Sequence, residues 1–349
     1  MDCKFIKLKP FLLSCGRIAG AVMAIVLCAW GGYWLWMPGM NSLPVDSRQL
    51  KNGIWLGHGW FADDAYFRRN PNRKAARFHD PAAVRELLRE LKSRQIHYVY
   101  PHMCPAQPDG SLPGHDHSRI AAFLDAADEF GIQVIPWIGG VLDESARIHD
   151  PAWRKRFCAS VGDLLAAHPR LAGVQINVEP LPDGDTAFLK LLAELKTVLA
   201  GKILSVAAYP PPTRWHPFPN VHWSPEYLRQ TAWHADQLCV MMYDTALRYE
   251  KFYIALMRSW TCELIKAVSD TRCELLFGLP AYDDADTGYH DPAVENLHSA
   301  LSGCAAGLAG ETKRPFTGFT IYCEWEMTPE KWSVWHKFFP PLRNQQRQP

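Results

Sequence analysis

The stretch Gly173-Val174-Gln175-Ile176-Asn177-Val178-Glu179 carries a polar side chain at every second position, 175, 177 and 179. Successive side chains of a β-strand point to opposite faces, so these three polar groups share one face. In a closed barrel that face points inward, where an unpaired polar group is costly. The stretch therefore predicts a buried strand that brings chemistry to the end of a barrel.

From Gly53 onward, short and nearly continuous apolar runs alternate with longer amphipathic segments. Such runs are typical of buried parallel strands, and the longer segments are typical of the helices that connect them. The strand-like runs lie near 53–58, 96–102, 132–138, 171–178, 202–209, 237–243, 273–280 and 316–322. The helical patterns lie near 81–94, 117–130, 151–168, 185–200, 225–235, 249–269, 292–310 and 329–339.

Eight strand–helix units predict a closed (β/α)8 barrel, the TIM barrel, in one α/β domain over 53–340. Capping residues before proline mark five helix starts: Asp80-Pro81, Asp150-Pro151, Ser224-Pro225, Asp291-Pro292 and Thr328-Pro329. A doubly wound open sheet is the alternative. Such sheets usually carry a Gly-rich phosphate turn after the first strand, and Gly57-His58-Gly59-Trp60 is not that turn.

The amino terminus predicts a membrane anchor. A basic segment, 1–17, precedes an uncharged run, 18–37, and about 20 apolar residues suffice for a membrane-spanning helix. Positive flanks stay in the cytoplasm, so we expect the barrel on the periplasmic or extracytoplasmic side of the cell (inner) membrane. Residues 38–52 are predicted to be a linker and 341–349 a polar tail. A cleaved signal peptide is the alternative, although the run is longer than usual for one.

The composition excludes one class of partner and favours another. The net charge of +1 and the pI near 7.6 give no sign of the basic stripe that nucleic-acid-binding proteins carry. The 14 Trp and 12 Tyr residues offer flat faces on which sugars stack, although aromatic side chains also fill cores.

Polar and aromatic side chains follow the predicted strands, at the carboxyl ends where TIM barrels hold their active sites. A carboxylate such as Glu179, at the inward-facing end of a strand, tends to have a raised pKa, which suits a general acid. Gln175 is interpreted either as a sugar contact or as part of a buried polar layer. The other candidates are His58, Trp60, His102, Trp137, Asn177, Tyr243, Asp244, Tyr282, Tyr322, Glu324 and Trp325.

The order of these motifs resembles the family 18 glycoside hydrolases, the chitinase-like barrels. That family reads D-G-x-D-x-D-x-E on strand four, S-x-G-G on strand three, M-x-Y-D on strand six and G-x-P-x-Y on strand seven. This chain carries the counterparts Ala172–Glu179, Trp137–Gly140, Met241–Asp244 and Gly278–Tyr282. Tyr322 stands where the family usually carries Trp on strand eight.

The chain departs from the family in the strand-four motif, where Ala172, Gln175 and Asn177 replace the three aspartates. In the family, the aspartate two positions before the glutamate holds the substrate's 2-acetamido group, which attacks the anomeric carbon. A carboxamide could do similar work, and the pair Asn177-Val178-Glu179 is similar to the Asn-x-Glu pair of the family 85 endo-β-N-acetylglucosaminidases.

The resemblance implies hydrolysis of a β-linked N-acetylhexosamine polysaccharide, without a cofactor. Glu179 would act as general acid and base, Asn177 and Tyr243 would position the acetamido group, and Asp244 would tune Glu179 or hold the sugar. Residues expected to contact the substrate are His58, Trp60, His102, Trp137, Gln175, Tyr282, Tyr322, Glu324 and Trp325.

Other hypotheses remain open. The missing aspartates fit a barrel that binds glycan without cleaving it. A metal-dependent hydrolase or deacetylase could use a cluster of His58, His102, His115, Asp116 and His117, since imidazole and carboxylate bind Zn²⁺. Glu324, Asp143 or Asp244 could instead be the carboxylate partner of Glu179, with a separation of about 5 Å for retaining and 6.5–9.5 Å for inverting chemistry.

Overall fold

The computed structural model describes residues 8–61, 64–72, 74–213, 220–286, 288–310 and 315–341. The chain divides into two compact units, Met1–Pro38 and Gly39–Pro349. Residues 1–7 of the predicted basic segment and 342–349 of the predicted tail lie outside the described residues.

The first unit is a single helix, α1 (Leu8–Leu35). Its stretch Arg17–Leu35 has a mean hydropathy of 1.8, and none of it is buried. By length and composition this helix could cross a membrane. A signal sequence near the amino terminus would have the same properties.

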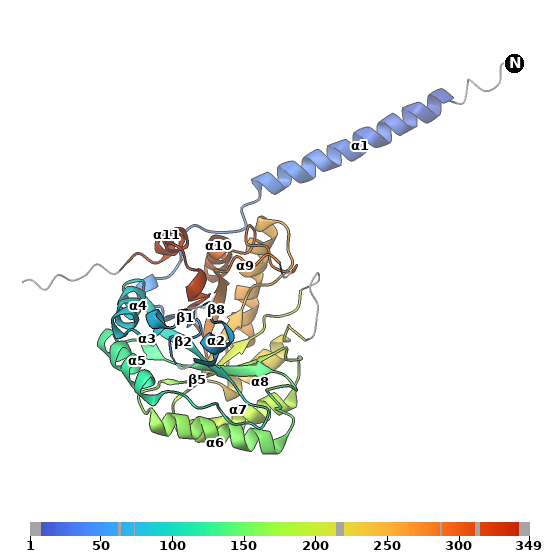
Figure 1. Ribbon diagram of the computed structural model, residues 1–349. Helices are drawn as coiled ribbons and strands as arrows, with labels where there is room; N and C mark the ends of the chain where they lie inside the picture. Colours follow the sequence, from blue (N-terminus) through green and yellow to red (C-terminus); the bar gives the residue numbers. More distant parts are fainter. Residues whose placement is uncertain are drawn as a thin grey trace, which may run out of the picture. The chain divides into compact units, whose positions relative to one another are not determined.

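The second unit is a closed barrel of parallel strands (Figure 1). β1 pairs with both β2 and β9, which closes the barrel. The short strands β3 and β4 both pair with β2, so together they occupy one strand position of the barrel. The strands are β1 (Asn52–Leu56), β2 (Ile96–Pro105), β3 (Gln133–Val134), β4 (Trp137–Val141), β5 (Gly173–Glu179), β6 (Ile203–Ala208), β7 (Gln237–Met241), β8 (Glu274–Pro280) and β9 (Phe316–Tyr322). The predicted TIM barrel is confirmed.

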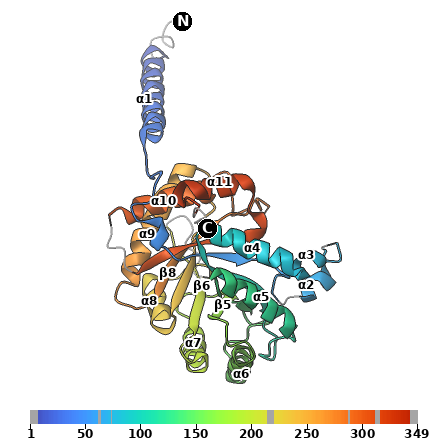
Figure 2. The ribbon, with the colours of Figure 1, turned by 90° about the vertical axis from the view of Figure 1, so that its left-hand side faces the viewer.

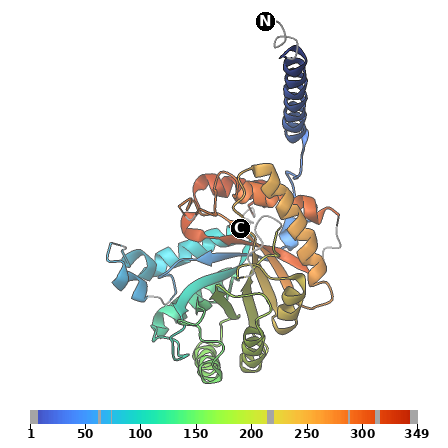
Figure 3. The same ribbon diagram turned by 90° about the vertical axis from the view of Figure 1, so that its right-hand side faces the viewer.

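Helices surround the strands, as Figures 2 and 3 show from opposite sides. They are α2 (Asp64–Arg69), α3 (Ala76–His79), α4 (Pro81–Ser93), α5 (His117–Phe130), α6 (Pro151–Ala167), α7 (Thr186–Leu199), α8 (Pro225–His234), α9 (Glu250–Ala267), α10 (Leu297–Leu308) and α11 (Pro329–Phe338). Two 3-10 helices, Ser47–Gln49 and Glu324–Glu326, lie in the connections. α2 and α3 occupy the long connection between β1 and α4.

Four of the five predicted helix starts are confirmed. Asp80, Asp150, Ser224 and Thr328 each accept a backbone N–H of the first turn, with proline at the start of the helix. The prediction at Asp291-Pro292 is wrong, because α10 begins only at Leu297. Residues 291–295 form a turn instead, which lets the carboxylate of Glu295 turn inward and accept the backbone N–H of Thr245 at 3.0 Å.

The segment predicted to be a linker, 38–52, lies within the barrel unit from Gly39 onward. The backbone N–H of Met40 donates to the carbonyl of Ser302 at 2.9 Å, and the Ser302 hydroxyl donates to the Met40 carbonyl at 2.9 Å. Leu43 and Leu50 pack against the core. These hydrogen bonds and apolar contacts therefore fix the segment to the barrel, so it is not a free linker.

Six polar side chains in the barrel interior are joined by hydrogen bonds, and we call them the interior polar layer: Trp55, Tyr100, Gln175, Ser205, Gln237 and Glu274. The Trp55 indole N–H donates to Gln175 Oε1 at 2.6 Å, and Gln175 Nε2 donates to Ser205 Oγ at 3.1 Å. Gln175 is fully buried, so its amide belongs to this layer and not to the rim.

Gln237 is the centre of the interior polar layer. Its Oε1 accepts the hydroxyls of Tyr100 at 2.6 Å and Ser205 at 2.8 Å. Its Nε2 donates to Glu274 Oε2 at 3.2 Å. Both polar atoms of the Gln237 amide are thus bonded in the interior, where an unpaired one would be costly.

Candidate active site

Glu179 is the last residue of β5 and lies partly buried at the carboxyl end of the barrel. Burial raises the pKa of its carboxyl above the ordinary value, and the negative charge of Asp244 raises it further. Hydrogen bonds from Asn177 and Tyr209 to the carboxylate act in the opposite direction but do not cancel the effect of burial. A carboxyl that keeps its proton to a higher pH is suited to donate it.

Two adjacent glycines of β4 allow close packing near this carboxyl. Gly139 pairs with Asn177 in the parallel register, and a Cβ atom at 139 would lie 1.6 Å from the Asn177 carbonyl oxygen. A Cβ atom at Gly140 would lie 2.2 Å from Ser145 Oγ. Gly139 is therefore required by packing against the strand that carries Glu179, and Gly140 by packing against the loop after β4.

A first pocket opens beside Glu179, and we call it the Glu179 pocket. Its lining consists of His102, Cys104, Pro105, Gly139, Gly140, Val141, Ser145, Asn177 and Glu179. Asn177 Nδ2 lies 3.4 Å from Glu179 Oε2, a long hydrogen bond. Asn177 Oδ1 and the nearby Trp137 Nε1 are buried but have no hydrogen-bond partner among the described residues. Buried polar atoms nearly always have a partner, so an unpaired one is unusual and leaves its hydrogen-bonding capacity unused. Both atoms could therefore bond to a ligand.

A second pocket, the aromatic pocket, is lined by Asp244, Tyr282, Asp284, Tyr289, Tyr322, Cys323, Trp325 and Glu326. The Tyr322 ring stacks on Tyr243 with centroids 5.5 Å apart, and Trp325 meets Tyr322 edge-on at 5.6 Å. Trp325 remains 46% exposed. Exposed aromatic faces next to acidic side chains suit a sugar, which has both apolar C–H faces and hydroxyl groups.

Asp244, in the lining of the aromatic pocket, is held by a set of neighbouring side chains. Its backbone is left-handed (φ +62°), and its carboxylate accepts the hydroxyl of Tyr282. His290 Nδ1 lies 3.5 Å from Asp244 and 3.6 Å from Glu295. Burial lowers the pKa of His290, but the hydrogen bonds and charges of these two carboxylates outweigh it and raise this pKa to about 9. These two carboxylates therefore favour the protonated form of His290.

Several sequence candidates lie together in these two pockets. Glu179, Asn177 and His102 line the first, and Asp244, Tyr282, Tyr322 and Trp325 line the second. Trp137 packs edge-on against His102 at 4.7 Å, and Tyr243 packs against Tyr282 and Tyr322.

Trp60 and Glu324 lie apart from these pockets and bind each other. The Trp60 indole N–H donates to Glu324 Oε2 at 3.1 Å, and the ring is only 3% exposed. Burial raises the pKa of Glu324, while Trp60 and Arg77 oppose the rise. The burial of Trp60 leaves little of its surface for stacking on a sugar.

The histidines considered for a metal site separate into two groups. His58 stacks on Tyr66 at 4.3 Å and contacts His102 at 3.9 Å between ring centroids. His115 and His117 lie beside His168 instead, and in the described part of the chain no group of three possible metal ligands includes His58 or His102.

Two further acidic candidates outside the pockets, Asp116 and Asp143, also have other partners. Asp116 caps α5 by accepting the backbone N–H groups of Ser118 and Arg119. Asp143 is exposed and pairs with His149.

The sequence analysis missed Tyr209, His290 and Glu295. Tyr209 directly follows β6, so its place at a strand end was a usable signal. His290 and Glu295 lie in the connection between β8 and α10 with no recognisable spacing, and only the fold brings them to Asp244.

Comparisons with known proteins show the fold. No protein-family model and no curated protein matches the sequence. The spore cortex-lytic enzyme SleL of Bacillus cereus is similar, with a TM-score of 0.55 and 12% identity over 84% of this chain and 75% of that one. A chitinase of Chromobacterium violaceum gives a TM-score of 0.53 and 14% identity over 82% and 98%. A class V chitinase of Pseudomonas fluorescens gives 0.53 and 12% over 82% and 99%.

Proposed function

We propose that this protein is a glycoside hydrolase that cleaves a β-linked polysaccharide containing N-acetylhexosamine. The observation that carries the proposal is the pairing of a partly buried Glu179, whose pKa is raised, with an Asn177 oxygen that has no partner among the described residues. The likeness of the barrel to chitinases and to a cortex-lytic enzyme supports the same class of reaction.

In the first step, the protonated Glu179 donates its proton to the glycosidic oxygen, and the bond from that oxygen to the anomeric carbon breaks. The carbonyl oxygen of the sugar's own 2-acetamido group bonds to the anomeric carbon and forms a cyclic oxazolinium. Asn177 and Tyr243 hold this acetamido group in place. Among the described residues, Asn177 Oδ1 has no partner and can accept the acetamido N–H.

In the second step, the Glu179 carboxylate takes a proton from water, and the water oxygen bonds to the anomeric carbon. The bond to the acetamido oxygen breaks, so the acetamido group is restored and Glu179 is again protonated. This use of an Asn-x-Glu pair parallels the family 85 resemblance. Burial and the negative charge of Asp244 raise the pKa of Glu179, which favours the protonated acid before each turnover.

The other rim residues would bind the sugar chain. Trp325, Tyr322 and Tyr282 offer stacking faces in the aromatic pocket, while His102 and Trp137 border the Glu179 pocket. His58 supports His102 through ring contact.

We further propose that α1 is an uncleaved, single-pass anchor that holds the barrel outside the cytoplasm. The basic residues before the apolar stretch support this orientation. Peptidoglycan or an exported polysaccharide would then be the substrate pool. Molecular mass of the mature protein in membrane fractions distinguishes an anchor from a removed signal sequence.

The proposal is tested by incubating the full chain with matched oligosaccharides, fully N-acetylated and fully deacetylated, and identifying products by mass spectrometry. We expect new reducing ends from the acetylated series alone, because the acetamido group is the attacking nucleophile. Equal cleavage of both series would refute catalysis by the substrate's own acetamido group. Absence of cleavage in both series would refute the proposal that the protein is a glycoside hydrolase.

A second candidate is a barrel that binds the same glycan without cleaving it. The replacement of the family's three aspartates by Ala172, Gln175 and Asn177 favours it. Saturable binding of the acetylated oligosaccharides without any new reducing end would support this candidate over hydrolysis.

A further inference from the structure

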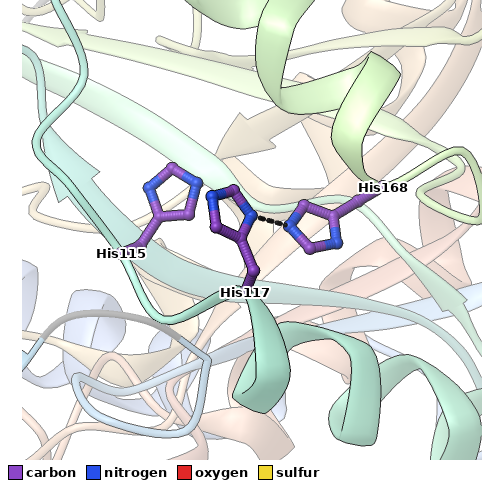
Figure 4. A group of neighbouring side chains, drawn as sticks. All are labelled: His115, His117 and His168. Atoms are coloured by element: carbon purple, nitrogen blue, oxygen red, sulfur yellow. Dashed lines mark hydrogen bonds between the residues drawn. The ribbon is translucent and has the colours of Figure 1, made fainter.

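Three histidines gather outside both pockets, at the start of α5 and the end of α6 (Figure 4). His115 lies in the connection before α5, His117 is the first residue of α5, and His168 caps the end of α6. One nitrogen atom of each ring lies within 4.8 Å of the others. His168 is buried, His115 is half-buried and His117 is exposed, so the cluster reaches the solvent on one side.

The distances resemble those around a bound metal ion. Zinc binds imidazole nitrogen at about 2.0–2.1 Å, which places two ligands of a tetrahedral site about 3.3 Å apart. His117 Nδ1 and His168 Nε2 are 2.8 Å apart and form a hydrogen bond. A small outward movement of the two rings would therefore admit a cation between them.

The third ring is oriented by a backbone contact. His115 Nδ1 lies 3.0 Å from the carbonyl oxygen of Pro113 and can donate a hydrogen to it. That tautomer carries the lone pair on Nε2, which is then the ligand atom. Metal-binding histidines usually donate their other N–H to such a carbonyl or to a carboxylate.

We propose that His115, His117 and His168 form a binding site for a late first-row divalent cation, zinc foremost, with water completing the coordination. Three imidazoles suit such metals. When the metal binds, the hydrogen shared by His117 and His168 moves to an outer ring nitrogen, so each ring stays neutral.

The metal would fix the connection between β2 and α5 to the outer helix α6. This connection already contacts α6, since the Trp153 indole N–H donates to the Gln107 carbonyl at 3.0 Å. The same connection continues from Cys104 and Pro105, which line the Glu179 pocket. The inferred role is structural, and it does not depend on the proposed hydrolysis.

The other group of possible ligands in the described residues, Asp244, His290 and Glu295, is a poorer candidate. Asp244 accepts the Tyr282 hydroxyl, and Glu295 accepts both the backbone N–H and the hydroxyl of Thr245. A metal bound there would have to displace these three hydrogen bonds. At the histidine cluster a metal displaces only the hydrogen bond between His117 and His168.

The test uses the full chain without a histidine tag, stripped with a chelator and then titrated with Zn²⁺ and, as a spectroscopic probe, Co²⁺. We expect one equivalent bound, a dissociation constant tighter than about 100 μM, visible d–d absorption of the Co²⁺ form, and a higher Tm with Zn²⁺. His115→Ala and His168→Ala should each weaken binding at least tenfold. His298→Ala, a histidine on α10 outside the cluster, should leave binding unchanged.

Because His168 is buried, its variant could fail to fold, and His117→Ala at the exposed position then provides the same test. Binding that survives both His115→Ala and His117→Ala would overturn the proposal. Loss of binding in His290→Ala but not in His115→Ala would overturn it as well and place the metal beside Asp244.

Discussion

The interior polar layer and the Glu179 pocket both use an amide side chain of β5, yet they differ in how that amide is bonded. In the layer, Gln175 and Gln237 use both the oxygen and the nitrogen of their amides. Two residues further along β5, Asn177 has one long hydrogen bond through its nitrogen, and its oxygen has no partner among the described residues. The amides deep in the barrel are thus fully bonded, whereas Asn177 retains an oxygen that could accept a hydrogen bond from a ligand.

The largest expected effect is on stability and separates the two regions. Gln237→Leu removes the acceptor of the Tyr100 and Ser205 hydroxyls, and each orphaned buried donor costs about 1–3 kcal/mol. Glu274 loses one hydrogen bond but keeps those from Tyr98 and Lys51. We expect the free energy of unfolding to fall by about 3 kcal/mol or more in urea unfolding followed by tryptophan fluorescence. Asn177→Leu, the matched variant at the rim, should change it by less than about 0.5 kcal/mol. Equal losses of unfolding free energy in the two variants would contradict the distinction between the interior polar layer and the Glu179 pocket.

The next effect is on turnover. Asn177→Ala removes the group proposed to hold the acetamido group, so we expect kcat to fall about 100-fold, with the Tm unchanged. The measurement is the initial rate of reducing-end formation from N-acetylated oligosaccharides. A variant that keeps wild-type kcat would show that Asn177 is not part of the reaction.

A smaller effect is expected on substrate affinity. Trp325→Ala removes an exposed stacking face of the aromatic pocket. An aromatic contact contributes about 0.5–1.5 kcal/mol, so KM should rise roughly two- to tenfold with little change in kcat. Trp233, which is 59% exposed on α8 and lines neither pocket, provides the control, and Trp233→Ala should leave KM unaltered.

The smallest effect is a pair of opposite shifts in pH dependence. Glu179 must be protonated to act, so its pKa sets the alkaline limb of kcat/KM. Asp244 raises this pKa, so Asp244→Asn should move the limb to lower pH. Tyr209 lowers it by hydrogen bonding, so Tyr209→Phe should move the limb to higher pH. Shifts in the same direction would mean that another group titrates.

Sequence periodicity predicted the barrel because buried parallel strands are nearly continuous apolar runs and because four of the connecting helices begin with a capping residue before proline. It also placed Glu179, Asn177 and Asp244 at strand ends. It could not tell Gln175 from Asn177, since both lie on one face, and only depth in the barrel separates the satisfied amide from the open one.

Contacts between distant segments could not be predicted from spacing. His168 follows His117 by 51 positions, and nothing in the sequence shows that α5 and α6 bring them together. Trp60 was expected to contact the substrate, but its packing against Phe78 and Glu324 depends on the path of the β1–α4 connection.

The central claim is that Glu179 is the proton donor of a glycosidase, and the most direct measurement is hydrolysis by Glu179→Gln. Glutamine keeps the shape and polarity of the side chain but has no acidic proton. We predict that kcat falls by about 100-fold or more, while the Tm and the binding of N-acetylated oligosaccharides are retained. Hydrolysis at the wild-type rate by a correctly folded variant would contradict the account.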